Sequence, residues 1–160
     1  RYLEDELDAS SLDADRAAGF TAFLGQDFPA ARAVKGHIIG PVSWALAVTD
    51  QERRPILYDD VLADAAARHL RLQAAWQERA LARVSAQTLI VVDEPYLSSF
   101  GSAFLAVERH EVQTLLEHVF AGIRGSVLLP RMPWQRSHRC THSEALRILS
   151  TFGGWGIRPA

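Results

Sequence analysis

The sequence of 160 residues has a single cysteine, Cys140, and no long uninterrupted apolar stretch. One cysteine excludes an internal disulfide, which suits the reducing cytoplasm. No apolar run approaches the roughly 18 residues that a membrane-spanning helix needs, and no signal peptide is visible. We therefore expect a cytoplasmic protein with no membrane partner. Because the chain begins at Arg1, we also expect its natural start to lie upstream.

The sequence also lacks a large excess of charge of one sign. The 17 basic and 19 acidic residues give a formal net charge of -2, and neither kind forms a block along the chain. Nucleic acid and anionic surfaces are therefore not expected as partners. With 48% hydrophobic and 22% charged residues, the chain should bury a core. Its length suits one domain or part of a larger one.

Strand and helix patterns alternate along the chain. Short apolar runs bounded by Gly, Pro and polar residues are typical of strands, and apolar residues at three-to-four spacing are typical of helices. The alternation predicts an α/β fold in which right-handed crossovers join parallel strands. We predict strands at residues 34–39, 88–92 and 126–129, and helices at residues 13–24, 41–48, 59–84 and 108–123.

The long helix predicted at residues 59–84 begins with Asp59 and Asp60, acids that favour the positive N-terminal end of a helix. Glu78 falls on the face that we expect to be exposed. Gly122 and Gly125 are predicted to end the last helix. The face of the long helix that we expect to be buried carries Leu62, Ala66, His69, Gln73, Trp76, Ala80 and Val84.

Two acids follow the apolar run of the second strand in the stretch "IVVDEPYLSSFGSAF". Ligands of parallel α/β proteins bind beyond the carboxyl ends of the strands, and Pro95 cannot continue the strand ladder. Asp93 or Glu94 is therefore predicted to face the mouth of the sheet or barrel and to bind a ligand amine or orient a catalytic group. The alternative, of equal weight, is an acid that caps the next helix or pairs with an arginine.

Other candidate residues favour structural roles. His37 lies in a predicted strand and His69 on the helix face expected to be buried, so both are predicted to be core histidines. Arg53 and Arg54 lie in a loop, where exposed arginines are common and contact with an anionic substrate is the minority interpretation. No serine, histidine and acid occur at triad spacing, and no Gly-rich phosphate loop is present.

Three stretches between Lys35 and Gly125, "KGHIIGPVSWALAVTDQ", "RPILYDDVLADAAARHL" and "IVVDEPYLSSFGSAF", resemble the cobalamin-independent methionine synthase-like proteins. That family shares a barrel superfamily with uroporphyrinogen decarboxylase. The resemblance implies a partial (β/α)8 TIM-type barrel for residues 1–125. It also implies methyl transfer from a small methyl donor to an amino-acid thiol such as homocysteine. Asp93 corresponds to the family's acid that contacts the substrate amino group, and we predict its neighbour Glu94 to be substrate-binding with it.

The resemblance further implies a zinc ion that holds the thiol as a thiolate, but its ligands are not identifiable in this chain. Where the family carries a His-x-Cys strand, the sequence reads "SVLLPRMPW". We therefore expect the chain as it stands to be inactive. Residues 126–160 form a tail that departs from the family pattern, as a truncated or frame-shifted coding sequence would produce. One stretch of the tail contains residue types that can bind zinc, namely His138, Cys140, His142 and Glu144. We expect these residues to lie on a solvated loop.

Two alternatives remain open at this stage. One is a uroporphyrinogen decarboxylase-like protein, which would need no zinc and would hold an acidic tetrapyrrole with arginines. The other is a non-catalytic barrel fragment. Such a fragment exposes strand edges and apolar helix faces, so it is expected to self-associate.

Overall fold

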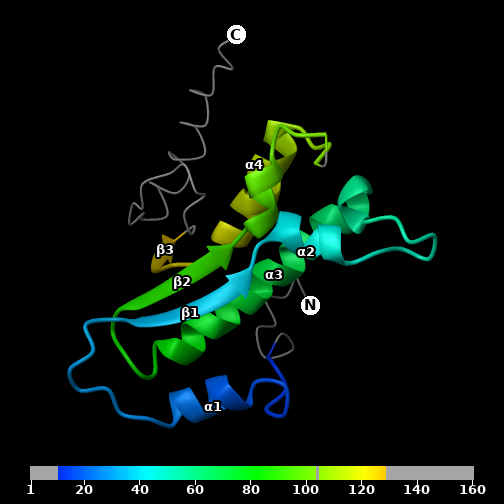
Figure 1. The fold of residues 1–160 in the computed structure, drawn as a ribbon. Helices are drawn as coiled ribbons and strands as arrows, with labels where there is room; N and C mark the ends of the chain where they lie inside the picture. Colours follow the sequence, from blue (N-terminus) through cyan, green and yellow to red (C-terminus); the bar gives the residue numbers. More distant parts are fainter. Residues whose placement is uncertain (1–10, 104, 129–160) are drawn as a thin grey trace.

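Three parallel strands form the centre of the protein in a computed structural model that describes residues 11–103 and 105–128 (Figure 1). The strands lie in the order β1, β2, β3, which is also their order along the chain. This mixed arrangement confirms the predicted α/β class. The elements are α1 (Ala18–Leu24), β1 (Val34–Ile39), α2 (Pro41–Ala47), η2 (Ile56–Tyr58), α3 (Asp60–Leu81), β2 (Thr88–Asp93), η3 (Pro95–Ser99), α4 (Arg109–Phe120) and β3 (Ser126–Leu128).

The predicted elements are all present, but α1 begins at Ala18 rather than at residue 13, and α3 ends at Leu81 rather than at residue 84. β1 has the predicted bounds, and β2 extends one residue further, to Asp93. Asp59 is the N-cap of α3, since its Oδ1 accepts hydrogen bonds from the backbone N–H groups of Val61 and Leu62, each at 3.0 Å. β3 begins just beyond the boundary predicted at residue 125 and pairs with β2. The rest of the tail lies outside the described residues.

The two faces of β1 have different surroundings. Along the strand, buried and exposed residues alternate, and Lys35, His37 and Ile39 are the exposed ones. The buried face packs on α3, and a Cβ atom added at Gly36 would lie 2.2 Å from Gln77 Oε1. Glycine at this position therefore allows the long helix to lie close to the sheet. His37, predicted to be a core histidine, is instead on the face that α3 leaves uncovered, so that prediction was wrong.

The buried face of α3 also differs from the prediction. Leu62 and His69 are exposed, and Glu78 is only 9% exposed, in contrast to the predicted pattern. Alanines occupy most sides of α3, so the apolar spacing does not fix which side turns inward. The helix also contacts the sheet, α2, α4 and η2, which buries a wide arc of its surface. Of the predicted face only Ala66 and Ala80 are buried. The other buried residues of α3 are Ala63, Ala67, Leu70, Leu72, Ala74, Gln77, Glu78 and Leu81.

The end of α4 is joined to α3 by two close contacts. A Cβ atom added at Gly122 would lie 2.5 Å from the backbone oxygen of Arg71. The Glu78 carboxylate accepts hydrogen bonds from the backbone N–H groups of Arg124, at 2.8 Å, and Gly125, at 2.6 Å. Among the described glycines only Gly101 has a positive φ, so Gly122 serves close packing rather than the left-handed helix end expected from the sequence.

Among residues 11–103 and 105–128, no helix is both long enough and apolar enough to cross a membrane.

Replacing Gly122 by alanine tests the contact between α3 and α4. Its Cβ atom would meet backbone rather than a flexible side-chain end, so we expect Gly122→Ala to lower the free energy of unfolding by about 1–3 kcal/mol. Gly19→Ala is the matched control, because a Cβ atom there meets nothing within 4 Å and alanine favours the helix. Urea unfolding of both variants measures the difference; equal midpoints would contradict the close contact.

Candidate functional site at the carboxyl end of the strands

The two acids predicted to form a site lie at the carboxyl end of β2, but in different surroundings. Asp93 is the last residue of the strand and is paired in register with Ile39 of β1. Its side chain is 44% exposed, whereas Glu94 is 4% exposed. The two carboxylates therefore serve different purposes, although they are adjacent in the sequence.

Asp93 lies beside His37 on the face of the sheet opposite α3. The parallel register pairs His37 with Val91, so His37 and Asp93 project from the same face of neighbouring strands. The distance from His37 Nε2 to Asp93 Oδ2 is 3.5 Å, and the His37 side chain is 53% exposed. An imidazole and a carboxylate this close together can both contact one polar ligand.

Glu94 closes the N-terminus of α2 from a distant part of the chain. Its Oε1 accepts a hydrogen bond from Val42 N, and its Oε2 accepts bonds from Ser43 N, at 2.8 Å, and Ser43 Oγ, at 2.6 Å. Pro41 has no N–H group, and Trp44 N bonds to Gly40 O. The first four positions of α2 therefore leave no backbone donor unsatisfied. Glu94 therefore caps a helix, but α2 precedes β2 in the sequence, whereas the alternative left open by the sequence was a cap on the next helix.

Gly40 makes the approach of Glu94 possible. It is the N-cap residue of α2, and because it is glycine it has no side chain that could cap the helix. A Cβ atom at this position would lie 2.2 Å from the Glu94 carboxyl carbon. Any larger residue would displace the carboxylate from the two backbone N–H groups.

Burial governs the ionisation of Glu94. Loss of hydration raises the pKa of its carboxyl to about 7, and the nearby charge of Asp93 acts in the same direction. Hydrogen bonds from Ser43 and Val42 favour the carboxylate and lower the pKa, but desolvation is the larger effect.

The same hydrogen-bond network fixes η3, the start of the loop after β2. Tyr96 N donates to Ser43 Oγ at 3.2 Å, and Leu97 N donates to Glu94 O at 3.1 Å. The aromatic side chains of Tyr96 and Phe100 remain 51% and 36% exposed. The loop expected from the sequence is thus partly helical. Its exposed aromatic residues are of the kind that line ligand pockets.

Two further candidates, His69 and Arg54, contact residues that lie within four positions of them in the sequence. His69 is exposed, contrary to the core role predicted for it, and its Nε2 lies 3.0 Å from Gln73 Nε2. Arg54 forms ion pairs with Asp50, at 3.1 Å, and Glu52, at 3.8 Å, within its own loop. These contacts give Arg54 a structural role in the loop.

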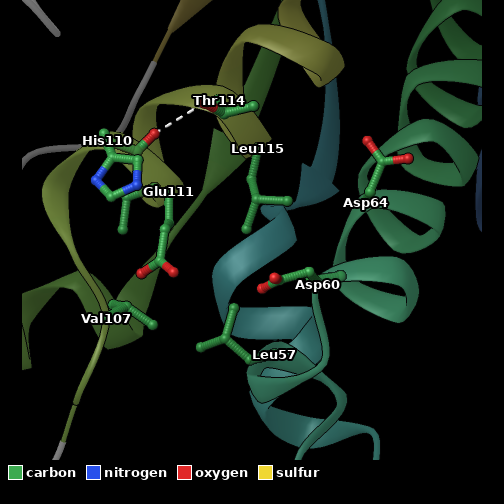
Figure 2. Close-up of a pocket in the computed structure, with 10 residues that line it drawn as sticks. Leu57, Asp60, Asp64, Val107, His110, Glu111, Thr114 and Leu115 are labelled. Carbon is green, nitrogen blue, oxygen red and sulfur yellow. Dashed lines mark hydrogen bonds between the residues drawn. The ribbon is translucent and has the colours of Figure 1, made fainter.

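A hollow that was not anticipated from the sequence lies between the first turns of α3 and α4 (Figure 2). Its volume is about 280 Å³. Asp60 and Asp64 of α3 and His110 and Glu111 of α4 are among the residues that line it. Glu111 accepts a hydrogen bond from Glu108 N as part of a capping box. No periodicity reveals this hollow, because its walls are separated by about fifty residues of chain.

Asp64 in this hollow is neutralised by its neighbours. Arg68 Nε lies 2.6 Å from one carboxylate oxygen, and His118 Nε2 lies 3.1 Å from the other. Two acids of the hollow therefore have structural roles. Asp64 pairs with Arg68 of α3 and His118 of α4, and Glu111 belongs to the capping box of α4.

The implied zinc ion finds no ligand set in the part of the chain that the structure describes. No three His, Cys, Asp or Glu side chains come together there in a way that could hold a metal ion. The motif with His138, Cys140, His142 and Glu144 lies outside the described residues. Zinc therefore stays a prediction from the resemblance.

Comparisons with protein-family models, with curated proteins and with solved structures found no match to this chain. The resemblance to the methionine synthase-like proteins thus also stays a prediction.

The titration of Glu94 gives a testable dependence of stability on pH. Its pKa is raised from 4.5 to about 7, so between these values the folded protein holds a proton that the unfolded chain releases. The stabilisation is complete below about pH 4.5 and is lost as the pH rises through about 7. Relative to Glu94→Gln, the wild type should lose on the order of 3 kcal/mol across this window.

Denaturant titrations at several pH values measure this difference. Glu117→Gln, which removes an exposed carboxylate of α4, is the control and should show a much smaller change. A constant difference between the wild type and Glu94→Gln across the window would show that Glu94 ionises as in the unfolded chain.

Proposed function

We propose that the chain is a segment of a methionine synthase-like barrel and that Asp93 binds the amino group of an amino-acid substrate. The reaction class is methyl transfer to a thiol, with homocysteine as the reference acceptor. The observation that carries the proposal is the position of Asp93, half-exposed at a strand tip on the face opposite α3. That is where parallel α/β proteins bind their ligands.

The topology supports the barrel part of the proposal. Parallel strands that are adjacent in space and consecutive in sequence are the repeating unit of a (β/α)8 barrel. The long helices α3 and α4 also pack against each other (Figure 1). The face opposite α3, with His37 and Ile39, then corresponds to the side that would face a barrel interior.

The chemistry of the strand tip supports the substrate part. A carboxylate accepts hydrogen bonds from an ammonium group, and such charge-assisted bonds are stronger than neutral ones. Within the described residues, Oδ1 of Asp93 makes no hydrogen bond, and Oδ2 has His37 as its neighbour. Tyr96 and Phe100, exposed in the following segment, supply apolar surface for a thioalkyl chain.

Glu94 was predicted with Asp93 to bind substrate, and we assign it a positioning role in this proposal. Both of its oxygens are occupied by α2, so it has no acceptor directed at a ligand. It instead holds the end of β2 and the start of η3 in place.

The alternative of a non-catalytic barrel fragment has one observation in its favour. Within the described residues β1 lies at the edge of the sheet, and Ile39, on its face opposite α3, is 40% exposed. An open edge of this kind can pair with another chain. Absence of any amino-acid binding by the wild type would favour this alternative over the methyltransferase proposal.

The proposal is tested by comparing L-homocysteine with 4-mercaptobutyrate, which differs only in lacking the amino group. The wild type should bind homocysteine more tightly, and Asp93→Asn should reduce that preference by about tenfold, as expected for loss of one charge-assisted hydrogen bond. Binding is measured by calorimetry on the full chain. Asp27→Asn, which changes another exposed aspartate, should keep the preference; equal affinities of the wild type for both thiols would refute the role of Asp93.

A further inference from the structure

His37 lies beside Asp93 at the carboxyl end of the sheet, and the proposed function uses only the carboxylate of this pair. The two side chains project from the same face of the neighbouring strands β1 and β2, opposite α3. The His37 side chain is 53% exposed. A ligand that binds to Asp93 would therefore also meet the imidazole.

The contact between the two side chains is a loose one. Nε2 of His37 lies 3.5 Å from Oδ2 of Asp93, which is longer than the roughly 2.7–3.2 Å of a usual N–H···O hydrogen bond. Because the contact is long and both side chains are about half exposed, it contributes little to stability. A ligand can replace it at small cost, so the two groups are available together although each is the other's neighbour.

The separation of the pair suits the two charged groups of an α-amino acid. In such a molecule two carbon atoms join the amino nitrogen to the nearer carboxylate oxygen, so these atoms lie roughly 3 Å apart. The ammonium group can donate to the Asp93 carboxylate while the ligand carboxylate accepts from the Nε2–H group of His37. Two charge-assisted hydrogen bonds would then replace one long contact.

A ligand with only one of these charged groups fits the pair less well. An amine without a carboxylate would occupy Asp93 and leave the imidazole N–H without an acceptor on the ligand. A carboxylate without an amine would lie close to the negative charge of Asp93, which repels it. Lys35 is exposed on the same face of β1, two positions before His37, and adds positive charge on the side of the pair that would receive the carboxylate.

We propose that His37 determines the specificity of this site for amino acids by binding the carboxylate of the substrate whose amino group Asp93 binds. The inference rests on the proposed function, because it assigns a second contact to the same ligand. Contacts from two different strands fix the orientation of the ligand, which a single contact cannot do. The sequence had favoured a core role for His37 and gave no reason to place it in a binding site.

The test compares L-homocysteine with 3-aminopropane-1-thiol, which differs only in lacking the carboxylate. In calorimetry on the full chain the wild type should prefer homocysteine. His37→Val should reduce this preference by about tenfold, as expected for loss of one hydrogen bond to a charged group. Valine suits an exposed strand position, and circular dichroism checks that the variant folds. The preference for homocysteine over 4-mercaptobutyrate should largely remain in His37→Val, because Asp93 is unchanged.

His69→Gln is the matched control, because it removes an exposed histidine of α3 that contacts Gln73, and it should leave both preferences unchanged. Equal affinities of the wild type for homocysteine and 3-aminopropane-1-thiol, or an unchanged preference in His37→Val, would overturn the role of His37 even where Asp93 binds the amino group.

An equal loss of both preferences in His37→Val would also overturn the inference, since His37 would then act only by positioning Asp93. Failure of the proposed function has a different signature, namely equal affinities of the wild type for homocysteine and 4-mercaptobutyrate. Absence of any binding of homocysteine would refute both proposals.

Discussion

The Glu94 carboxylate at the N-terminus of α2 is the interaction on which the arrangement of the carboxyl end depends. It joins β2 to α2 across about fifty residues of sequence through two backbone N–H groups and one hydroxyl. Loss of a single acceptor there would leave a buried donor unsatisfied, at a cost of about 1–3 kcal/mol. Because Ser43 also accepts from Tyr96 N, the same contact sets the course of the chain after the strand.

Asp93, the neighbouring acid, is exposed because Glu94 alone makes the buried contact with α2. Successive residues at a strand end point to opposite sides, so when Glu94 turns toward α2, Asp93 lies on the face opposite α3, beside His37. A buried carboxylate thus supports an exposed one. Glu78 makes an analogous contact at the opposite end of the sheet, where it fixes the turn before β3.

The proposed ligand site lies at the carboxyl end of the sheet. This end carries Asp93, with the exposed aromatic residues Tyr96 and Phe100 in the segment that follows. Such a combination suits a cationic amino group on an apolar chain. A single exposed carboxylate can serve this purpose without an excess of charge of one sign over the whole molecule, in agreement with the near-neutral composition.

The sequence alone determined the α/β class, the positions of the described strands and α-helices, and the location of Asp93 at a strand tip, because periodicity and turn residues act locally. It did not determine the side of α3 that is buried, since alanines on most sides of that helix leave its orientation to its neighbours. Nor did it determine the exposure of His37, the burial of Glu78 and Glu94, or the hollow between α3 and α4. Each of these depends on residues about fifty positions apart meeting in space, and the backbone groups that bind the two glutamates have no signature in the side-chain sequence.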